Sequence, residues 1–129
     1  MMDDAPPPQP PERAGARERT TRVLFVCGKN KWRSPTAEQI FAEHRDHQGI
    51  ECLSAGLSPE SPTPVSVDLI QWADVIFVME PVHKTRLAAR FGEHLASTRV
   101  VCLDIPDRFC EMDPALIELL ERRVPPHLR

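Results

Sequence analysis

Four short apolar runs, separated by segments with helical spacing, constrain the fold of this chain more than any other feature. The runs occupy residues 22–26, 50–54, 75–79 and 99–103 and are rich in the β-branched side chains of buried strands. Strands that alternate with helices favour a parallel sheet covered by helices on both faces. We therefore expect an α/β three-layer sandwich around a four-stranded sheet, with the flavodoxin-like order 2-1-3-4 that is common in such folds.

Each predicted helix start combines a proline with a preceding residue whose side chain can cap a helix. The pairs are Ser34-Pro35, Thr63-Pro64, Glu80-Pro81 and Asp113-Pro114. The last predicted helix begins at the fourth pair and ends at Pro125-Pro126, because consecutive prolines cannot continue a helix.

The length and composition fit one globular domain behind a polar tail. The chain has 129 residues, of which 41% are hydrophobic and 27% are charged, as in ordinary globular proteins. Residues 1–21 are rich in proline and charge and lack the apolar segment of a secretory signal. We expect a disordered tail there, a single domain over residues 22–129 and a cytoplasmic location. A net charge of −3 argues against a nucleic-acid partner, and no apolar run approaches the roughly 18 residues of a membrane span.

The four cysteines do not form a pattern that binds metal. They stand at positions 27, 52, 102 and 110, with no C-x-x-C spacing and no histidine at the distance typical of zinc sites. We therefore expect no metal and no cofactor, and we expect thiols rather than structural disulfides.

The loop between the first predicted strand and the first predicted helix carries the pattern C-x5-R-S. Ligands of parallel α/β folds bind at the carboxyl ends of the strands, where such loops lie. Backbone N–H groups of this loop and of the helix N-terminus can surround a phosphate. The phosphate-binding residues would be Gly28, Lys29, Asn30, Lys31, Trp32, Arg33 and Ser34.

The side chains at the two ends of the loop suit phosphoryl transfer. A helix N-terminus and nearby cations favour the thiolate form of a cysteine, which makes Cys27 a candidate nucleophile. Arg33 can bind two phosphate oxygens with its planar guanidinium, and the Ser34 hydroxyl can hydrogen-bond the sulfur. A lone cysteine could equally be an apolar strand end, but its spacing to Arg33 and Ser34 favours catalysis.

The stretch "VLFVCGKNKWRSPTAEQIF" resembles the signature of the low-molecular-weight protein tyrosine phosphatases, in which an apolar strand leads into C-x5-R-S-P-x-A-E. Three further segments match in the same order: "SAG" at 54–56, "WADVIFVME" at 72–80 and "DIPDRF" at 104–109. The resemblance therefore extends from about residue 22 to the last predicted helix. It implies that Cys27 is the nucleophile, that Arg33 binds the phosphoryl group and that Asn30 supports the loop through a contact with Ser54.

The resemblance also implies a general acid, which is an aspartate before Pro-Tyr in the family. The matching stretch here reads Pro106-Asp107-Arg108-Phe109. This match assigns the acid role to Asp107 and places Phe109, in the tyrosine position, at the substrate rim. Asp104 is the alternative acid, because it leaves the fourth strand at the same sheet edge, although a turn role is the simpler interpretation of Asp104.

Departures from the family pattern leave the substrate open. Trp32 replaces a cysteine that many relatives carry before the arginine, and Lys29 and Lys31 make the mouth of the site more basic. The chain contains no tyrosine, so Phe109 and Trp32 are the aromatic candidates for contacting a substrate. The expected partner is a phosphorylated protein or a small phosphoester, and the oligomeric state stays open.

We expect a phosphomonoester hydrolase of the protein-tyrosine-phosphatase type that works through a cysteinyl-phosphate intermediate. One alternative is an arsenate reductase-like oxidoreductase with the same fold, in which Cys110 would serve as a second thiol near Cys27. Another is a non-catalytic anion-binding module. A binder needs no acid, so the joint presence of Cys27, Arg33, Ser34 and an acid candidate favours the enzyme.

Overall fold

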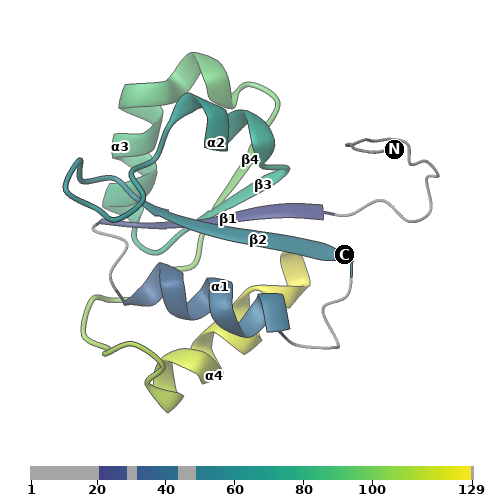
Figure 1. The fold of residues 1–129 in the computed structure, drawn as a ribbon, viewed down its shortest axis with the longest axis vertical. Helices are drawn as coiled ribbons and strands as arrows, with labels where there is room; N and C mark the ends of the chain where they lie inside the picture. Colours follow the sequence, from purple (N-terminus) through teal and green to yellow (C-terminus); the bar gives the residue numbers. More distant parts are fainter. Residues whose placement is uncertain (1–20, 29–31, 44–48, 129) are drawn as a thin grey trace, which may run out of the picture.

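The computed structural model describes residues 21–28, 32–43 and 49–128. Its strands are β1 (Thr21–Cys27), β2 (Ile50–Gly56), β3 (Val75–Val78) and β4 (Arg99–Cys102). Its α-helices are α1 (Arg33–Glu43), α2 (Val67–Trp72), α3 (Pro81–Phe91) and α4 (Pro114–Arg123), with 3₁₀ turns η4 (Gly92–Leu95) and η5 (Pro125–His127) (Figure 1). Residues 1–20 of the predicted tail lie outside the described residues. Within the described ranges, every helix is too short or too polar to cross a membrane.

The sheet is parallel throughout, with the strand order β2-β1-β3-β4. Helices α1 and α4 cover one face, and α2 and α3 cover the other (Figure 1). This arrangement confirms the predicted α/β sandwich and its order 2-1-3-4. The carboxyl ends of the strands therefore meet along one edge, where the loops that follow them converge.

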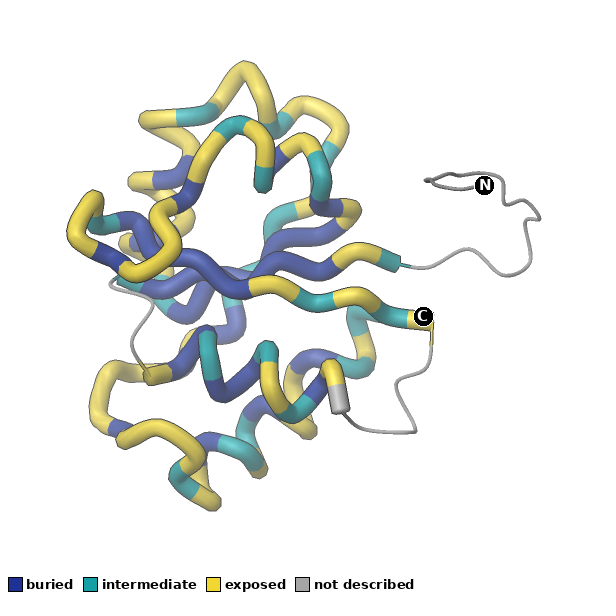
Figure 2. Tube along the Cα trace, viewed as in Figure 1, coloured by how far each residue is buried: buried dark blue, intermediate teal, exposed yellow. Residues whose placement is uncertain are grey.

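Strand β1 is buried on both faces, because a central strand of a three-layer sandwich contacts both helical layers. Phe25 and Cys27 belong to the core cluster on the α1 and α4 side, whereas Leu24 and Val26 belong to the cluster on the α2 and α3 side. Figure 2 shows this burial as a dark blue trace through the central strands. The alternation along β1 thus turns the Cys27 side chain toward the layer that contains α1.

The predicted starts of the third and fourth helices are confirmed. Helix α3 begins at Pro81 with Glu80 as its N-cap, and α4 begins at Pro114 with Asp113 as its N-cap. In both cases the proline occupies a first-turn position whose N–H would lack an intrahelical partner.

The predicted start of the second helix at Thr63-Pro64 is wrong. Helix α2 begins at Val67, and the N-cap is Ser66, whose hydroxyl accepts a hydrogen bond from a first-turn N–H at 3.3 Å. Thr63 and Pro64 instead lie beside the end of β2, where the Gly56 N–H donates to the Thr63 carbonyl at 2.9 Å. Proline disfavours helical backbone in the residue before it, which suits this extended segment.

Candidate active site

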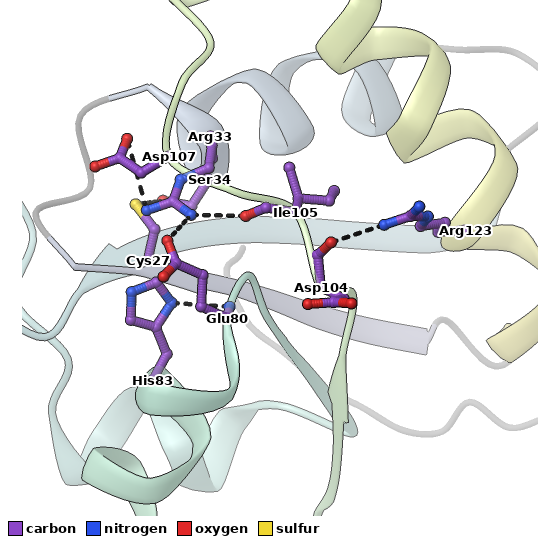
Figure 3. Close-up of polar contacts among 9 residues, drawn as sticks. All are labelled: Cys27, Arg33, Ser34, Glu80, His83, Asp104, Ile105, Asp107 and Arg123. Carbon is purple, nitrogen blue, oxygen red and sulfur yellow. Dashed lines mark hydrogen bonds and ion pairs between the residues drawn. The ribbon is translucent and has the colours of Figure 1, made fainter.

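Loops that follow β1, β3 and β4 meet at one cavity at the carboxyl edge of the sheet. The cavity has a volume of about 480 Å³. Its lining among the described residues consists of Cys27, Gly28, Trp32, Arg33, Glu80, His83 and Asp107. Figure 3 draws Cys27, Arg33, Glu80, His83 and Asp107 of this set. Residues from three separate loops therefore surround the predicted nucleophile.

Cys27 is the last residue of β1 and is 3% exposed. Its Sγ lies 3.0 Å from the Oγ of Ser34, in the first turn of α1. The backbone around Cys27 is supported by the segment after β2, because the Leu57 N–H donates to the Cys27 carbonyl and the Ser58 N–H donates to the Gly28 carbonyl. A hydroxyl donor beside the sulfur can stabilise a thiolate both as attacking and as leaving group.

Arg33 begins α1 and is 5% exposed. Its Nη1 donates to Glu80 Oε2 in an ion pair and to the Ile105 carbonyl oxygen at 2.8 Å. Its Nη2 lies 3.8 Å from Asp107 Oδ1. These contacts hold the guanidinium between the loops that follow β3 and β4, so its orientation is fixed before a ligand binds.

The two candidate acids are placed differently. The Asp107 carboxylate lines the cavity, and its side chain is 72% exposed. Asp104 has a left-handed backbone with φ of 58° and lies away from Cys27, while its carbonyl oxygen accepts a hydrogen bond from Arg123 at 2.8 Å (Figure 3). The geometry therefore favours Asp107 as the acid and gives Asp104 the role of a turn residue.

His83 and Glu80 complete the cavity wall, and the sequence interpretation did not assign either of them to the site. The Glu80 N–H donates to His83 Nδ1 at 3.1 Å within a capping box at the start of α3. Burial lowers the pKa of His83 below its usual 6.5, and the charges of Arg33 and Arg86 lower it further against the opposing effect of Glu80 and Asp107. The sequence did contain one signal for this part of the site, because Glu80 directly follows the predicted strand at residues 75–79 and therefore lies at the carboxyl edge of the sheet.

Phe109 does not lie at the substrate rim as predicted. Its side chain is 8% exposed and packs in the core cluster that also contains Leu116 of α4. The Arg108 guanidinium lies 5.5 Å from the centre of the Phe109 ring. Burying a phenyl ring removes a large apolar surface from water, which explains its inward position. The aromatic residue on the described cavity wall is Trp32, which is 36% exposed.

The predicted contact between Asn30 and Ser54 stays a prediction. Lys29, Asn30 and Lys31 lie outside the described residues. Ser54 is buried at the end of β2, and its hydroxyl donates to Glu38 Oε1 at 2.6 Å. This bond ties β2 to α1.

The four cysteines, all within the described residues, are present as thiols. Cys110 is exposed and is not part of the cavity wall. Burial, and after it the charge of Glu38, raises the pKa of Cys52 from 9.0 to about 12. Cys52 is therefore protonated at neutral pH and unsuited to act as a second nucleophile. The described residues contain no group of three or more side chains that could hold a metal ion.

Comparison with known proteins relates the chain to one phosphatase family. A sequence model described as low molecular weight phosphotyrosine protein phosphatase matches residues 22–68. The protein-arginine-phosphatase of Bacillus subtilis (strain 168) is 27% identical over 96 residues, which cover 56% of this chain and 64% of that relative. The aligned part thus spans just under two thirds of the relative's own length.

Two solved structures illustrate the shared fold. One is a cysteine-to-serine mutant of the YwlE arginine phosphatase with a phosphorylated active-site serine, with a TM-score of 0.66, 24% identity, and coverage of 84% of this chain and 95% of that one. The other is the tyrosine phosphatase Wzb from Escherichia coli K30 in complex with phosphate, with a TM-score of 0.65, 19% identity, and coverage of 81% and 93%. Residues 22–68 therefore resemble the low molecular weight phosphotyrosine protein phosphatase family, and the described chain shares the fold of these two solved phosphatases.

Proposed function

We propose that this protein hydrolyses phosphomonoesters through a phosphocysteine intermediate on Cys27. One observation carries the proposal: the Cys27 sulfur lies 3.0 Å from the Ser34 hydroxyl in a cavity that also contains Arg33 and Asp107. A nucleophile, an oxyanion-binding cation and an acid are the three groups that two-step phosphoryl transfer requires.

In the first step, the Cys27 thiolate attacks phosphorus, so that an S–P bond forms while the P–O bond to the leaving group breaks. Asp107, in its protonated form, gives its proton to the departing oxygen. Arg33 and the backbone N–H groups of the loop bind the non-bridging oxygens, on which charge redistributes in the transition state. The exposure of Asp107 at the cavity mouth suits contact with a leaving group that extends outward.

In the second step, water attacks the phosphocysteine and the S–P bond breaks. Asp107 is now a carboxylate and takes the proton of the attacking water, so one residue serves as acid and then as base. The Ser34 hydroxyl donates to the departing thiolate, and inorganic phosphate leaves with Cys27 restored. Because the nucleophile must stay reduced, the proposal fits a reducing compartment such as the cytoplasm.

The substrate class follows from the cavity wall and from the named relatives. Trp32 provides an apolar face for an aryl or other flat leaving group, and phosphotyrosine in a protein has such a group. Two of the relatives are described as arginine phosphatases, so phosphoarginine is the second substrate to compare. A panel of phosphotyrosine peptide, phosphoarginine peptide and small alkyl phosphates would rank these classes by kcat/KM.

The nucleophile can be tested by trapping the intermediate. Wild-type protein and the Cys27→Ser and Cys27→Ala variants would be incubated with an aryl phosphate and analysed by intact-protein mass spectrometry. We expect turnover only in the wild type, and a stable phosphoryl adduct at position 27 in the serine variant, as in the solved relative with a phosphorylated active-site serine. Hydrolysis by the alanine variant at the wild-type rate would refute the covalent mechanism.

The same assay separates hydrolysis from arsenate reduction. Substituting Cys110 by serine should leave phosphate-ester turnover unchanged, because Cys110 lies outside the cavity wall. Arsenate-dependent oxidation of a thiol reductant that disappears in Cys110→Ser would instead support the oxidoreductase alternative.

A further inference from the structure

His83 is buried in the wall of the cavity, but no step of the proposed reaction uses it. It lies in the first turn of α3 and is 4% exposed. A nearly buried imidazole beside a nucleophilic cysteine is uncommon unless both ring nitrogens have partners.

The hydrogen bond at Nδ1 determines where the ring hydrogen lies. His83 Nδ1 accepts a hydrogen bond from the Glu80 N–H at 3.1 Å, so Nδ1 carries a lone pair. Burial and the charges of Arg33 and Arg86 favour the neutral ring against Glu80 and Asp107. A neutral ring with a lone pair at Nδ1 must carry its hydrogen at Nε2.

The Nε2 side of the ring faces the cavity. A methyl group built on Gly28 would lie 3.7 Å from His83 Nε2, so this nitrogen packs beside the residue that directly follows the nucleophile. In Figure 3 the Nδ1 side of the ring faces Glu80 and the opposite side turns toward Cys27. The hydrogen bond that holds the ring in the structure is the one at Nδ1, on the side away from Gly28.

We propose that His83 is a substrate-binding residue whose Nε2–H donates a hydrogen bond to an oxygen of the phosphoryl group bound next to Cys27. The inference rests on the proposed function, because it assumes that this cavity holds a phosphoryl group. Arg33 would bind that group from the α1 side and His83 from the α3 side, so the phosphate would be held between two helix starts. A neutral donor adds this contact without placing a second cation beside Arg33.

Two substitutions distinguish the role of Nδ1 from the role of Nε2. In His83→Asn the amide oxygen can replace Nδ1 as the acceptor for the Glu80 N–H, but the side chain is too short to replace the Nε2 donor. In His83→Gln the amide nitrogen can reach the Nε2 position, while the acceptor for Glu80 is lost. The affinity for inorganic phosphate would be measured by calorimetry with the full chain, and folding by thermal unfolding.

We expect His83→Asn to keep its thermal stability and to bind phosphate roughly 10–100-fold more weakly, as for loss of a hydrogen bond to a charged group. His83→Gln should unfold at a lower temperature but bind phosphate more tightly than His83→Asn. Wild-type phosphate affinity in a folded His83→Asn protein would overturn the proposal.

A measurement on the wild type covers the case in which neither variant folds. The Nε2–H resonance of ¹⁵N-labelled histidine should shift downfield and exchange more slowly with water when phosphate is added. An Nε2–H signal that phosphate does not change would refute the contact. If phosphate binding depends on His83 but the protein hydrolyses no phosphoester, the contact is supported and the proposed hydrolase activity is rejected. If the protein hydrolyses phosphoesters but neither the His83 variants nor the Nε2–H signal respond to phosphate, the activity is supported and the contact is rejected.

Discussion

Two parts of the candidate active site border the same cavity and are held in different ways. The cradle, which we define as Cys27, Arg33 and Ser34, is at most 5% exposed, and Arg33 is fixed by contacts to the segments that follow β3 and β4. The acid loop, residues 103–112, carries Asp107 at its exposed tip and has left-handed backbone at Asp104 and at Met112. The cradle is thus buried throughout, whereas the acid loop buries Leu103, Ile105 and Phe109 but exposes Asp107.

Side-chain hydrogen bonds tether the acid loop to the helices on one face of the sheet. Arg123 of α4 donates to the Leu103 and Asp104 carbonyl oxygens at 2.9 and 2.8 Å. At the other end, the Met112 N–H donates to the Thr36 hydroxyl of α1 at 2.9 Å. Positive φ costs energy in residues other than glycine, so these contacts stabilise a conformation that the backbone alone would not favour. Substitutions in the cradle should therefore change binding and stability together, whereas a substitution of the exposed Asp107 should change chemistry alone.

The largest effect is expected for Asp107→Asn. On substrates with a basic leaving group, loss of the acid should lower kcat/KM by roughly 10²–10⁴-fold, but the effect should nearly vanish for a leaving group that departs without a proton. The measurement is kcat/KM across a series of aryl phosphates of rising leaving-group pKa. Stability should stay within about 0.5 kcal/mol of the wild type because the side chain is exposed.

Asp104→Asn is the matched control for this series. Asparagine tolerates left-handed backbone, so the turn with φ of 58° should persist. If Asp104→Asn shows the steeper dependence on the leaving group, the assignment of the acid is reversed, and if neither variant does, the acid lies elsewhere.

Arg33→Lys tests the cradle and should have the next largest effect. Lysine keeps the charge but cannot contact Glu80, the Ile105 carbonyl and a phosphate with one planar fork. We expect kcat/KM to fall by roughly 10²–10³-fold, as for loss of an oxyanion donor. Phosphate affinity and thermal stability should fall with it, unlike in Asp107→Asn. The control is Arg122→Lys, at an exposed position on α4, which should change neither kcat/KM nor phosphate affinity nor thermal stability. If Arg122→Lys lowers these three quantities as much as Arg33→Lys, the effect is not specific to the cradle.

The sequence predicted the parts of this molecule that depend on local pattern. The alternation of apolar runs with helical segments predicts the parallel sheet and its two helical layers, and Cys27, Arg33 and Ser34 lie within one short stretch of chain. The contact between Arg33 and Glu80 joins residues 47 positions apart, so no local pattern could indicate it. The inward position of Phe109 depends on how deeply the acid loop packs against α4, which local sequence does not determine.

Arg123→Ala tests whether the tether positions the acid loop, and a moderate effect is expected. Loss of two hydrogen bonds to carbonyl oxygens should destabilise the protein by about 1–3 kcal/mol. Because Asp107 would be held less firmly, kcat should fall by about tenfold on substrates with basic leaving groups, with KM nearly unchanged. The control is Arg122→Ala, whose exposed side chain forms an ion pair with Glu118 at 3.9 Å on the surface of α4. Equal kcat values for the two variants would contradict a positioning role for Arg123.

The smallest effect concerns the pH dependence of stability through His83. The folded-state pKa of His83 lies below the usual 6.5, with burial as the main cause, so the unfolded chain binds the proton more readily. The contribution of His83 to the free energy of unfolding is therefore fully present above about pH 6.5, and it is lost as the pH falls through the lowered folded-state pKa. Protonation would also remove the Nδ1 acceptor of the Glu80 N–H, and Glu80 is the residue that pairs with Arg33.

The measurement is urea unfolding at several pH values on both sides of 6.5. The free energy of unfolding should decline toward low pH in the wild type, and the decline should be shallower in His83→Asn, which keeps an acceptor but cannot titrate. Parallel curves for the two proteins would mean that His83 binds its proton equally well in the folded and unfolded states, which would contradict a pKa lowered by folding.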